Sequence, residues 1–448
     1  MSTDSVAARP QDEESRLQKN EAQVSPEKQC ETASSQSLVK AKEPQLDGGW
    51  RAWCCVLSSF LQFAICLGGP NAFGVFQAEY SLREFRGTSD LMISFIGGTD
   101  LAFLVVTCLA VGRLCELWGP RLVAAVGTVF TVAGLLAASW CRSVPALIAT
   151  QGVVQGIGGG CIFVASTSIV PPWFVKKRAL AMGIASAGLG AGGIAWSYIY
   201  RAMIGSLGYQ WTLRISAFIT IAIMAFAIII VTSPAGSRKA SKAGNWKTAF
   251  GMYKQEPWLI SYWLAFFIFF FGFSTPQFYL PQYIQTLGGA TPSQGAGISA
   301  VINAGAVVGR VGMGFMGDSR VGIMNMFCIG IVLAGILQAV MWLPADGNLP
   351  TSFVFALLYG ITGVGAIGVA PAVLAVHLDH SKLASLIGVF FTCEIAGFLT
   401  GPSIAGAVLA RADYRAVIGY SCGAMILGSA FAVIARFQIA KGVLLAKV

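Results

Sequence analysis

The sequence predicts an all-α integral membrane protein with twelve transmembrane helices in two pseudo-symmetric six-helix bundles. Of the 448 residues, 55% are hydrophobic and only 11% are charged, whereas a soluble domain has about 25% charged residues. From Trp50 onward, apolar segments follow one another in regular succession. A water-exposed surface this poor in charge would aggregate, so we expect lipid to surround much of the chain.

Residues 1–46 differ in kind from the rest. They are rich in Ser, Gln, Glu and Lys and contain no aromatic residue. Such a segment cannot bury enough apolar surface to offset its ordering entropy, so we expect a disordered cytosolic tail. It also lacks the positive start and apolar core of a secretory signal, so the first apolar segment would act as the insertion signal.

Twelve apolar segments then reach the length of about 20 residues that a helix needs to cross a bilayer. The first six belong to a predicted N-terminal bundle, 47–232, and the last six to a C-terminal bundle, 258–440. The polar stretch 233–257 is expected to be a cytosolic central loop, and 441–448 a short cytosolic tail. The predicted spans are 52–76, 91–112, 121–140, 145–169, 179–201, 211–232, 258–283, 295–317, 321–343, 351–374, 384–409 and 415–437.

The two halves echo each other. Gly156-Ile-Gly158 in the fourth span recurs as Gly363-Val-Gly365 in the tenth. Gly112, at the end of the second span, has a counterpart 202 residues later in Gly314. Two similar halves joined by a loop are typical of transporters built from repeats.

The distribution of Lys and Arg predicts the orientation. Connections on the side of the two termini hold more of them, including Lys176, Lys177 and Arg178 and the basic central loop. By the positive-inside rule both termini lie in the cytosol, and we expect the plasma membrane as the location. The net charge of +10 therefore reflects topology rather than nucleic-acid binding.

The connection between the second and third spans carries a recognisable motif. It reads Gly112-Arg-Leu-Cys-Glu116-Leu-Trp-Gly119-Pro-Arg121, and the copy after the eighth span keeps its spacing in Gly314 and Asp318. The motif resembles the signature of the major facilitator superfamily, although Leu117 and Pro120 stand where bases are usual. A tight turn with an acid–base pair could latch two bundles in one state, which makes these residues candidates for a conformational gate. The alternative is a plain basic turn.

Two further segments resemble the paired signatures of the monocarboxylate porter family, including its fungal members. One is Asp47-Gly48-Gly49-Trp50 before the first span, and the other opens the fifth span with Phe174, Lys177, Arg178 and Gly183. The resemblance covers roughly 47–440 and implies the major facilitator fold.

The same resemblance also marks departures from the family. In the well-known animal members, a lysine in helix 1 and an Asp–Arg pair in helix 8 handle the carboxylate and its proton. Here the lysine position is Asn71, and Arg310 keeps the arginine position while Ala306 replaces the acid. Proton-coupled lactate or pyruvate transport is therefore not implied.

Three ionisable residues lie inside predicted spans: Asp100, Arg310 and Glu394. Each costs about 2.5–3.5 kcal/mol at mid-bilayer on insertion scales, so such residues are functional candidates. With Asn71 they form the predicted substrate and coupling set. Arg310 would attract an anionic or polar group, while Glu394 or Asp100 would carry a coupling proton. The alternative is a structural acid–base bridge between helices.

Other motifs indicate packing rather than chemistry. GxGxxG patterns begin at Gly188 and Gly363, but neither follows a strand, so we interpret them as closely packed helix faces. The many phenylalanines of the seventh span point all around a helix, so most should pack or face lipid while some could stack on a planar substrate. The cysteines and the two histidines lack the spacing of a metal site, and no cofactor or ATP-binding motif is present.

These features together predict a secondary transporter, not an enzyme. It would move a small organic acid or an amphipathic metabolite by alternating access, as a monomer in the lipid bilayer, with protons as the coupling partner. The fungal-type resemblance implies export of a secondary metabolite. The alternatives are a monocarboxylate uptake porter and a transport-incompetent sensor or scaffold.

Overall fold

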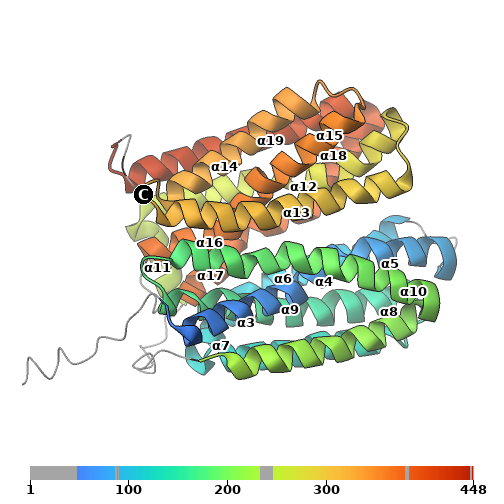
Figure 1. Ribbon diagram of the computed structural model, residues 1–448, viewed down its shortest axis with the longest axis horizontal. Coiled ribbons are helices and arrows are strands. Elements are labelled where there is room, and N and C mark those ends of the chain that lie inside the picture. The colour runs from blue at the N-terminus through green and yellow to red at the C-terminus, as the bar shows by residue number, and fades with distance from the viewer. Residues whose placement is uncertain are drawn as a thin grey trace, which may run out of the picture. The chain divides into compact units, whose positions relative to one another are not determined.

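The computed structural model describes residues 48–85, 88, 90–232, 246–378, 383–443, 446 and 448. The predicted tail 1–46 and most of the predicted central loop, 233–245, lie outside these residues. The rest of that loop is helical, since α11 spans Trp246–Gln255. Elements carry the labels of Figure 1.

The N-terminal half consists of helices joined by short connections over its described residues. Short π-helical turns at Tyr80–Glu84 and Ile148–Val154 and a 3₁₀ turn at Pro171–Trp173 adjoin its α-helices. The α-helices are α3 (Trp50–Cys66), α4 (Gly68–Asn71), α5 (Phe73–Glu79), α6 (Asp90–Trp118), α7 (Pro120–Ala138), α8 (Val144–Leu147), α9 (Gln155–Ile169) and α10 (Arg178–Ile230).

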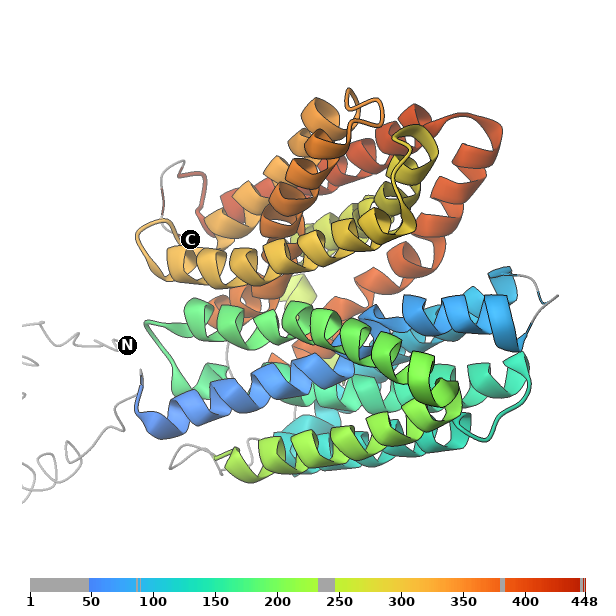
Figure 2. The ribbon, with the colours of Figure 1, turned by 45° about the vertical axis from the view of Figure 1, so that its right-hand side comes forward.

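The C-terminal half follows the same plan. It has π-helical turns at Gln338–Trp342 and Gly360–Val364. Its remaining α-helices are α12 (Pro257–Leu287), α13 (Pro292–Asp318), α14 (Ile323–Leu337), α15 (Leu349–Tyr359), α16 (Gly365–His377), α17 (Leu383–Phe391), α18 (Cys393–Arg411) and α19 (Tyr414–Ile439). Figures 1 and 2 show the two halves as separate groups of helices, blue to green and yellow to red.

The number of membrane crossings depends on the break in α10 and on the interrupted helix α3–α5. Ten helices of the described chain are long and apolar enough to cross a membrane, and α10 alone has 53 residues. At 1.5 Å per residue α10 would be about 80 Å long, more than twice the hydrocarbon thickness. Gly208 breaks it with φ 76° and ψ 169°, so it makes the fifth and sixth crossings.

The first crossing is also interrupted. It consists of α3, with 17 residues, and its continuation through α4 and α5. Counted over the described residues, the predicted twelve crossings in two six-helix groups are confirmed.

Glycines bring the helices of the N-terminal half into close contact. A Cβ at Gly192 would lie 2.6 Å from the backbone of Ala64, and Gly188 meets the carbonyl of Phe60. Gly188 and Gly192 therefore pack α10 on α3, because only glycine lets two backbones approach this closely. The Gly188 pattern is a closely packed helix face, as predicted, and its Gly190 contacts α13 of the other half.

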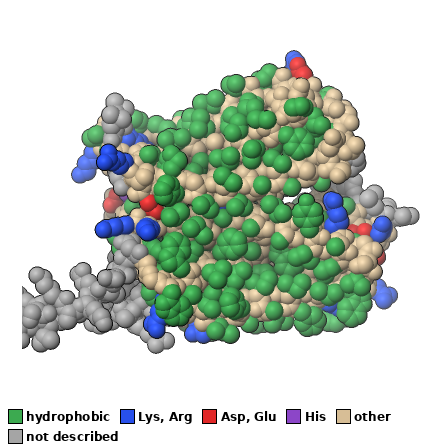
Figure 3. Space-filling view, viewed as in Figure 1, with side chains coloured by type: hydrophobic (Ala, Val, Ile, Leu, Met, Phe, Trp, Pro, Cys, Tyr) green, Lys and Arg blue, Asp and Glu red, His purple; other side chains and the backbone are tan. Residues whose placement is uncertain are grey.

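The outer surface is apolar. Val129, Phe218, Ile229 and Phe315 are between 61% and 68% exposed, and hydrophobic side chains cover much of the face in Figure 3. Large exposed apolar areas on a helical chain of this length mark contact with lipid.

The two halves meet at two matched crossings. Gly183 of α10 faces the carbonyl of Arg310 on α13, and Gly388 of α17 faces the carbonyl of Cys108 on α6. Arg310 precedes Gly314 by four residues, just as Cys108 precedes Gly112. The predicted repeat therefore has a structural basis at these crossings.

The predicted match between the glycines of the fourth and tenth spans is wrong by three residues. Gly156 packs on the carbonyl of Asp100, and the glycine that packs on the corresponding carbonyl, that of Ile302, is Gly360 rather than Gly363. The π-helical turns also differ in position, since one ends before Gly156 and the other begins at Gly360.

Candidate functional site

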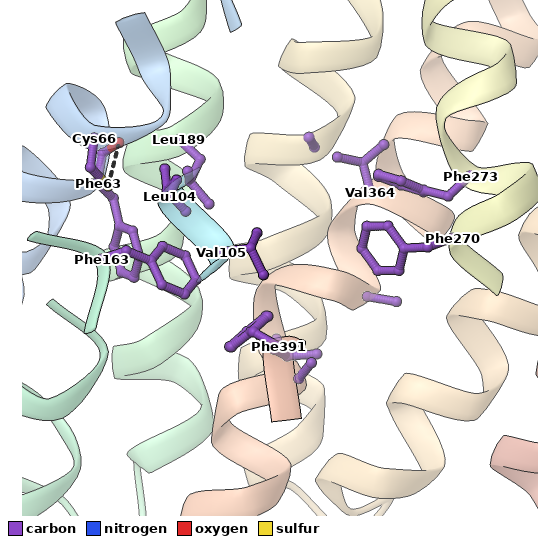
Figure 4. Packing of buried hydrophobic residues seen from close by; sticks show 14 of the residues in the cluster. Phe63, Cys66, Leu104, Val105, Phe163, Leu189, Phe270, Phe273, Val364 and Phe391 are labelled. Atoms are coloured by element: carbon purple, nitrogen blue, oxygen red, sulfur yellow. Dashed lines mark hydrogen bonds between the residues drawn. The ribbon is translucent and has the colours of Figure 1, made fainter. Parts of the chain in front are cut away.

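A central cavity lies between the two halves, with about 1070 Å³ of empty space. Its walls are mostly apolar, and six phenylalanines line it: Phe63, Phe163, Phe270, Phe273, Phe391 and Phe398. Figure 4 shows Phe63 and Phe163 on one side of this region, Phe270 and Phe273 on the other, and Phe391 between them. Phe163 and Phe391 meet edge to face across the halves, with ring centroids 5.0 Å apart.

A few polar groups interrupt the apolar walls. They are Asn71 of α4, Ser186 of α10, Gln277 of α12, Asn303 and Arg310 of α13 and Glu394 of α18. A large apolar pocket with a few convergent polar groups is the usual form of a small-molecule site. The structure brings three of the four predicted substrate and coupling residues together here, namely Asn71, Arg310 and Glu394.

Arg310 is buried, with 6% exposure, and its contacts cross between the halves. Its Nη1 donates to the Ser186 carbonyl at 3.0 Å, while its Nε has no hydrogen-bond partner. Arg310 forms no ion pair with any described residue. A buried guanidinium in this state retains donors for an anion.

Glu394 presents the opposite charge to the same cavity. It lies in the first turn of α18 and is 7% exposed. Its Oε1 is buried without a hydrogen-bond donor, and it forms no ion pair with a described residue. The alternative of a structural bridge with Arg310 is thus absent from this conformation. Both groups are left to interact with whatever enters the cavity.

Asp100 lies elsewhere. It is 5% exposed on α6 and lines a small second cavity inside the N-terminal half. Gln151, Gln155 and Tyr200 line the same space. The sequence placed Asp100 with the other ionisable residues, but α4 separates it from Arg310 and Glu394.

One end of the central cavity is closed by contacts between the halves. Asp318, at the end of α13, accepts hydrogen bonds from the backbone N–H groups of Ala179 at 2.9 Å and Leu180 at 2.7 Å. These N–H groups belong to the first turn of α10 and have no partner within their helix. The carboxylate therefore caps a helix of the other half and complements its dipole.

A second contact at this end has the opposite polarity. Arg178 donates from Nη1 to the carbonyl of Ala375 at 2.7 Å and from Nε to that of Phe174 at 2.8 Å. Ala375 lies in the last turn of α16, where carbonyls are unpaired and a cation is favoured. At the far end, away from the C-terminus, Figure 3 shows a hollow between the halves.

The remaining gate candidates lie near the ends of α6 and α13 and at the start of α7. Gly314 packs on the carbonyl of Ala179. Gly112 is buried in α6, and Glu116 is half-buried in its last turn. Gly119 is the N-cap of α7, and its φ of 83° favours glycine. The first turn of α7 holds Arg121, which is exposed.

The family-signature residues have structural roles at the same end. Gly48 and Gly49 have φ 148° and 92° and lead into α3 at Trp50, whereas Asp47 lies outside the described residues. Phe174 is fully buried against Trp53, with ring centroids 5.4 Å apart. Lys177 is exposed at the N-cap of α10.

Several lining residues were not singled out from the sequence: Asn303, Gln277, Ser186 and the phenylalanines outside α12. Asn303 had a usable signal, because it lies seven residues before Arg310 and hence on the same face of one helix. The aromatic residues of α9 and α17 had no such signal. The sequence of a uniformly apolar helix does not show which of its faces meets the other half. Within the described chain no cluster of His, Cys, Asp or Glu could hold a metal ion.

Comparisons with known proteins show the family. The Major Facilitator Superfamily profile matches residues 52–393. The MFS transporter asaE of Aspergillus flavus is 30% identical over 427 residues, covering 92% of this chain and 95% of that protein. The Agnestins efflux protein AgnL12 of Paecilomyces divaricatus is 30% identical over 413 residues, covering 92% and 93%.

Solved structures show the same fold at low identity. The human organic anion transporter MFSD10 superposes with a TM-score of 0.69 at 14% identity, covering 85% of this chain and 99% of that one. FucP in the outward conformation gives 0.67 at 15% identity, covering 86% and 98%.

Proposed function

The chain belongs to the major facilitator superfamily and is a membrane transporter, and from this premise we propose that it exports an amphipathic organic acid by alternating access. The observation that carries the proposal is Arg310, a buried cation that forms no ion pair with a described residue, in a cavity lined by phenylalanines from both halves. An anion with an apolar body would satisfy both features at once.

Export is supported by the names of relatives. Besides the Agnestins efflux protein, the Fujikurins efflux protein of Gibberella fujikuroi is 28% identical over 415 residues, covering 91% of this chain and 88% of that protein. We infer that this chain also moves a secondary metabolite outward, across the plasma membrane and with both termini cytosolic. Residues Gly48, Gly49, Phe174 and Arg178 support assignment to the monocarboxylate porter-like group.

Alternating access is supported by the arrangement of contacts. Asp318 and Arg178 join the halves at one end of the cavity. Rocking of the two bundles would break these bonds and expose the cavity on that side. Loss of the Arg310–Ser186 bond in the same movement would link the state of the gate to the cation that meets the substrate.

The energy source we propose is a proton gradient. Glu394 and Asp100, the two carboxylates that the sequence places within spans, are both buried, and neither forms an ion pair with a described residue. A carboxylate in this setting takes up a proton readily, because burial of an unpaired charge is costly.

Flux measured in proteoliposomes tests the proposal. A suitable probe is radiolabelled 2-naphthalenesulfonate, a planar anion that stays ionised and so leaks slowly. Wild type should give saturable flux, Arg310→Ala should lose it, and Arg411→Ala, which removes an exposed cation, should keep it. Saturable flux that survives in Arg310→Ala would refute the assigned role of the arginine.

A further inference from the structure

The small cavity of the N-terminal half has a larger share of polar side chains in its lining than the central cavity has. Asp100, Gln151, Gln155 and Tyr200 line it from α6, the π-helical turn, α9 and α10. Asp100 is buried, with 5% of its surface exposed. No hydrogen bond or ion pair joins its carboxylate to another described residue. A lone carboxylate at this depth requires a neutralising partner.

The amides around Asp100 bring further oxygen acceptors to the cavity. The Oε1 of Gln155 is buried and has no donor. The Oε1 of Gln151 accepts from the Tyr80 hydroxyl at 3.0 Å, which fixes that oxygen in place. The π-helical turn Ile148–Val154 directly precedes Gln155, and such turns often occur at functional sites.

Among the described residues, no basic side chain lines the cavity or pairs with the carboxylate of Asp100. The titratable side chains that face it are Tyr200 of α10 and Cys66 of α3, with Tyr80 behind Gln151. The lining residues from α4, α5, α7 and α9 contribute no titratable group, and no Lys, Arg or His lines the cavity. A buried carboxylate that shares a cavity with amide and phenol oxygens has the chemistry that binds a small cation.

The broken first crossing connects this cavity to the central one. Gly69 and Pro70 of α4 line the small cavity, whereas Leu67 and Asn71, on either side of them, line the central cavity. Pro70 has no N–H, so the carbonyl of Cys66 has no donor four residues on. Interrupted helices with freed carbonyls form the ion sites of other transporter folds.

We propose that the Asp100 cavity binds the single monovalent cation that drives transport. This cation is the proton of the proposed gradient, carried on Asp100, or a sodium ion in its place, bound by side-chain oxygens of Asp100, Gln151 and Gln155. Glu394 then contacts the substrate, and α4 transmits cation occupancy to Asn71. The inference rests on the proposed function, since it assigns the coupling site of that transporter.

Two assays, substrate exchange and gradient-driven substrate accumulation, distinguish a loss of ion coupling from a loss of substrate binding. Proteoliposomes containing wild type, Asp100→Asn, Glu394→Gln or the surface control Asp346→Asn are assayed with 2-naphthalenesulfonate, once by exchange without an ion gradient and once under an imposed proton or sodium gradient. Asp100→Asn should still exchange substrate but lose gradient-driven accumulation at least tenfold. Glu394→Gln should lose both, and Asp346→Asn neither.

Gln155→Met provides a second variant that keeps side-chain volume and removes the unpaired oxygen. It should raise the cation concentration that gives half-maximal accumulation about threefold or more. Which gradient drives wild type identifies the cation. Accumulation that persists in Asp100→Asn under the effective gradient would overturn the inference, as would wild-type accumulation without response to either gradient. Absence of exchange in wild type would instead refute the proposed function.

Discussion

The side chain of Arg310 on α13 lies directly against Gly368 on α16. A Cβ at residue 368 would be 2.6 Å from both Cδ and Nε of Arg310, which is closer than real side chains approach. Gly368 therefore leaves the space through which the guanidinium reaches the Ser186 carbonyl and the central cavity. A glycine whose motif resembles a nucleotide-binding loop serves here to position a cation.

Gly368→Ala should displace the Arg310 guanidinium. We expect the affinity of the purified protein for 2-naphthalenesulfonate to fall about tenfold, which corresponds to about 1.4 kcal/mol. Gly312→Ala is the matched control, because it lies on the same helix as Arg310 and its added Cβ meets nothing within 4 Å. Equal affinities of Gly368→Ala and wild type, measured by equilibrium binding, would show that Arg310 does not need this space.

Asp318→Asn should weaken the closed end of the cavity. The amide retains one acceptor but loses the charge that complements the α10 N-terminus, so we expect a loss of about 1 kcal/mol. That loss shifts a two-state equilibrium about fivefold towards opening. Distance measurements between spin labels on the ends of α10 and α13 would detect it, with Asp346→Asn as control. An unchanged distance distribution would contradict the capping role.

The fold could be predicted from sequence because its determinants are local. Apolar length fixed the crossings, and the repeated spacing of Gly112–Glu116 and Gly314–Asp318 indicated two related halves. The break at Gly208 lies in the predicted gap between the fifth and sixth spans. The gap is shorter than predicted, because helical residues extend up to Gly208 on both sides.

The site could be predicted only in part, because cavity membership depends on which helix faces which. Arg310 and Glu394 were found through the cost of charge in lipid, a property of single residues. The same argument gathered Asp100 with them, although it faces the interior of one half. Asn303 and Phe391 carry no such cost, so only the contact between halves reveals them.

Phe270→Leu should change substrate preference. Phe270 is 1% exposed and lines the central cavity, whereas Phe278 on the same helix is 59% exposed and does not. An aromatic pair contributes about 0.5–1.5 kcal/mol beyond burial, so the ratio of affinities for 2-naphthalenesulfonate and octanesulfonate should fall about two- to tenfold. Phe278→Leu should leave this ratio unchanged. Equal ratios in the two variants would argue against stacking on Phe270.

Gly183→Ala and Gly388→Ala should have the same effect, although the residues lie 205 positions apart. Each faces a backbone carbonyl of the other half, that of Arg310 or Cys108, and an added methyl group would push the crossing apart. Backbone cannot yield as a flexible side chain does, so both variants should disfavour the closed end and populate the open state. Cys108 is a native reporter, because it is fully buried beside the α6–α17 crossing.

We expect a small maleimide to label Cys108 several-fold faster in both variants, as measured by mass spectrometry of the peptide. Gly423→Ala, whose Cβ would meet nothing within 4 Å, should label at the wild-type rate. Faster labelling in Gly388→Ala alone would indicate a local disturbance at Cys108. Faster labelling in Gly183→Ala as well requires that the two crossings open together, since Gly183 touches neither α6 nor α17 at its own crossing.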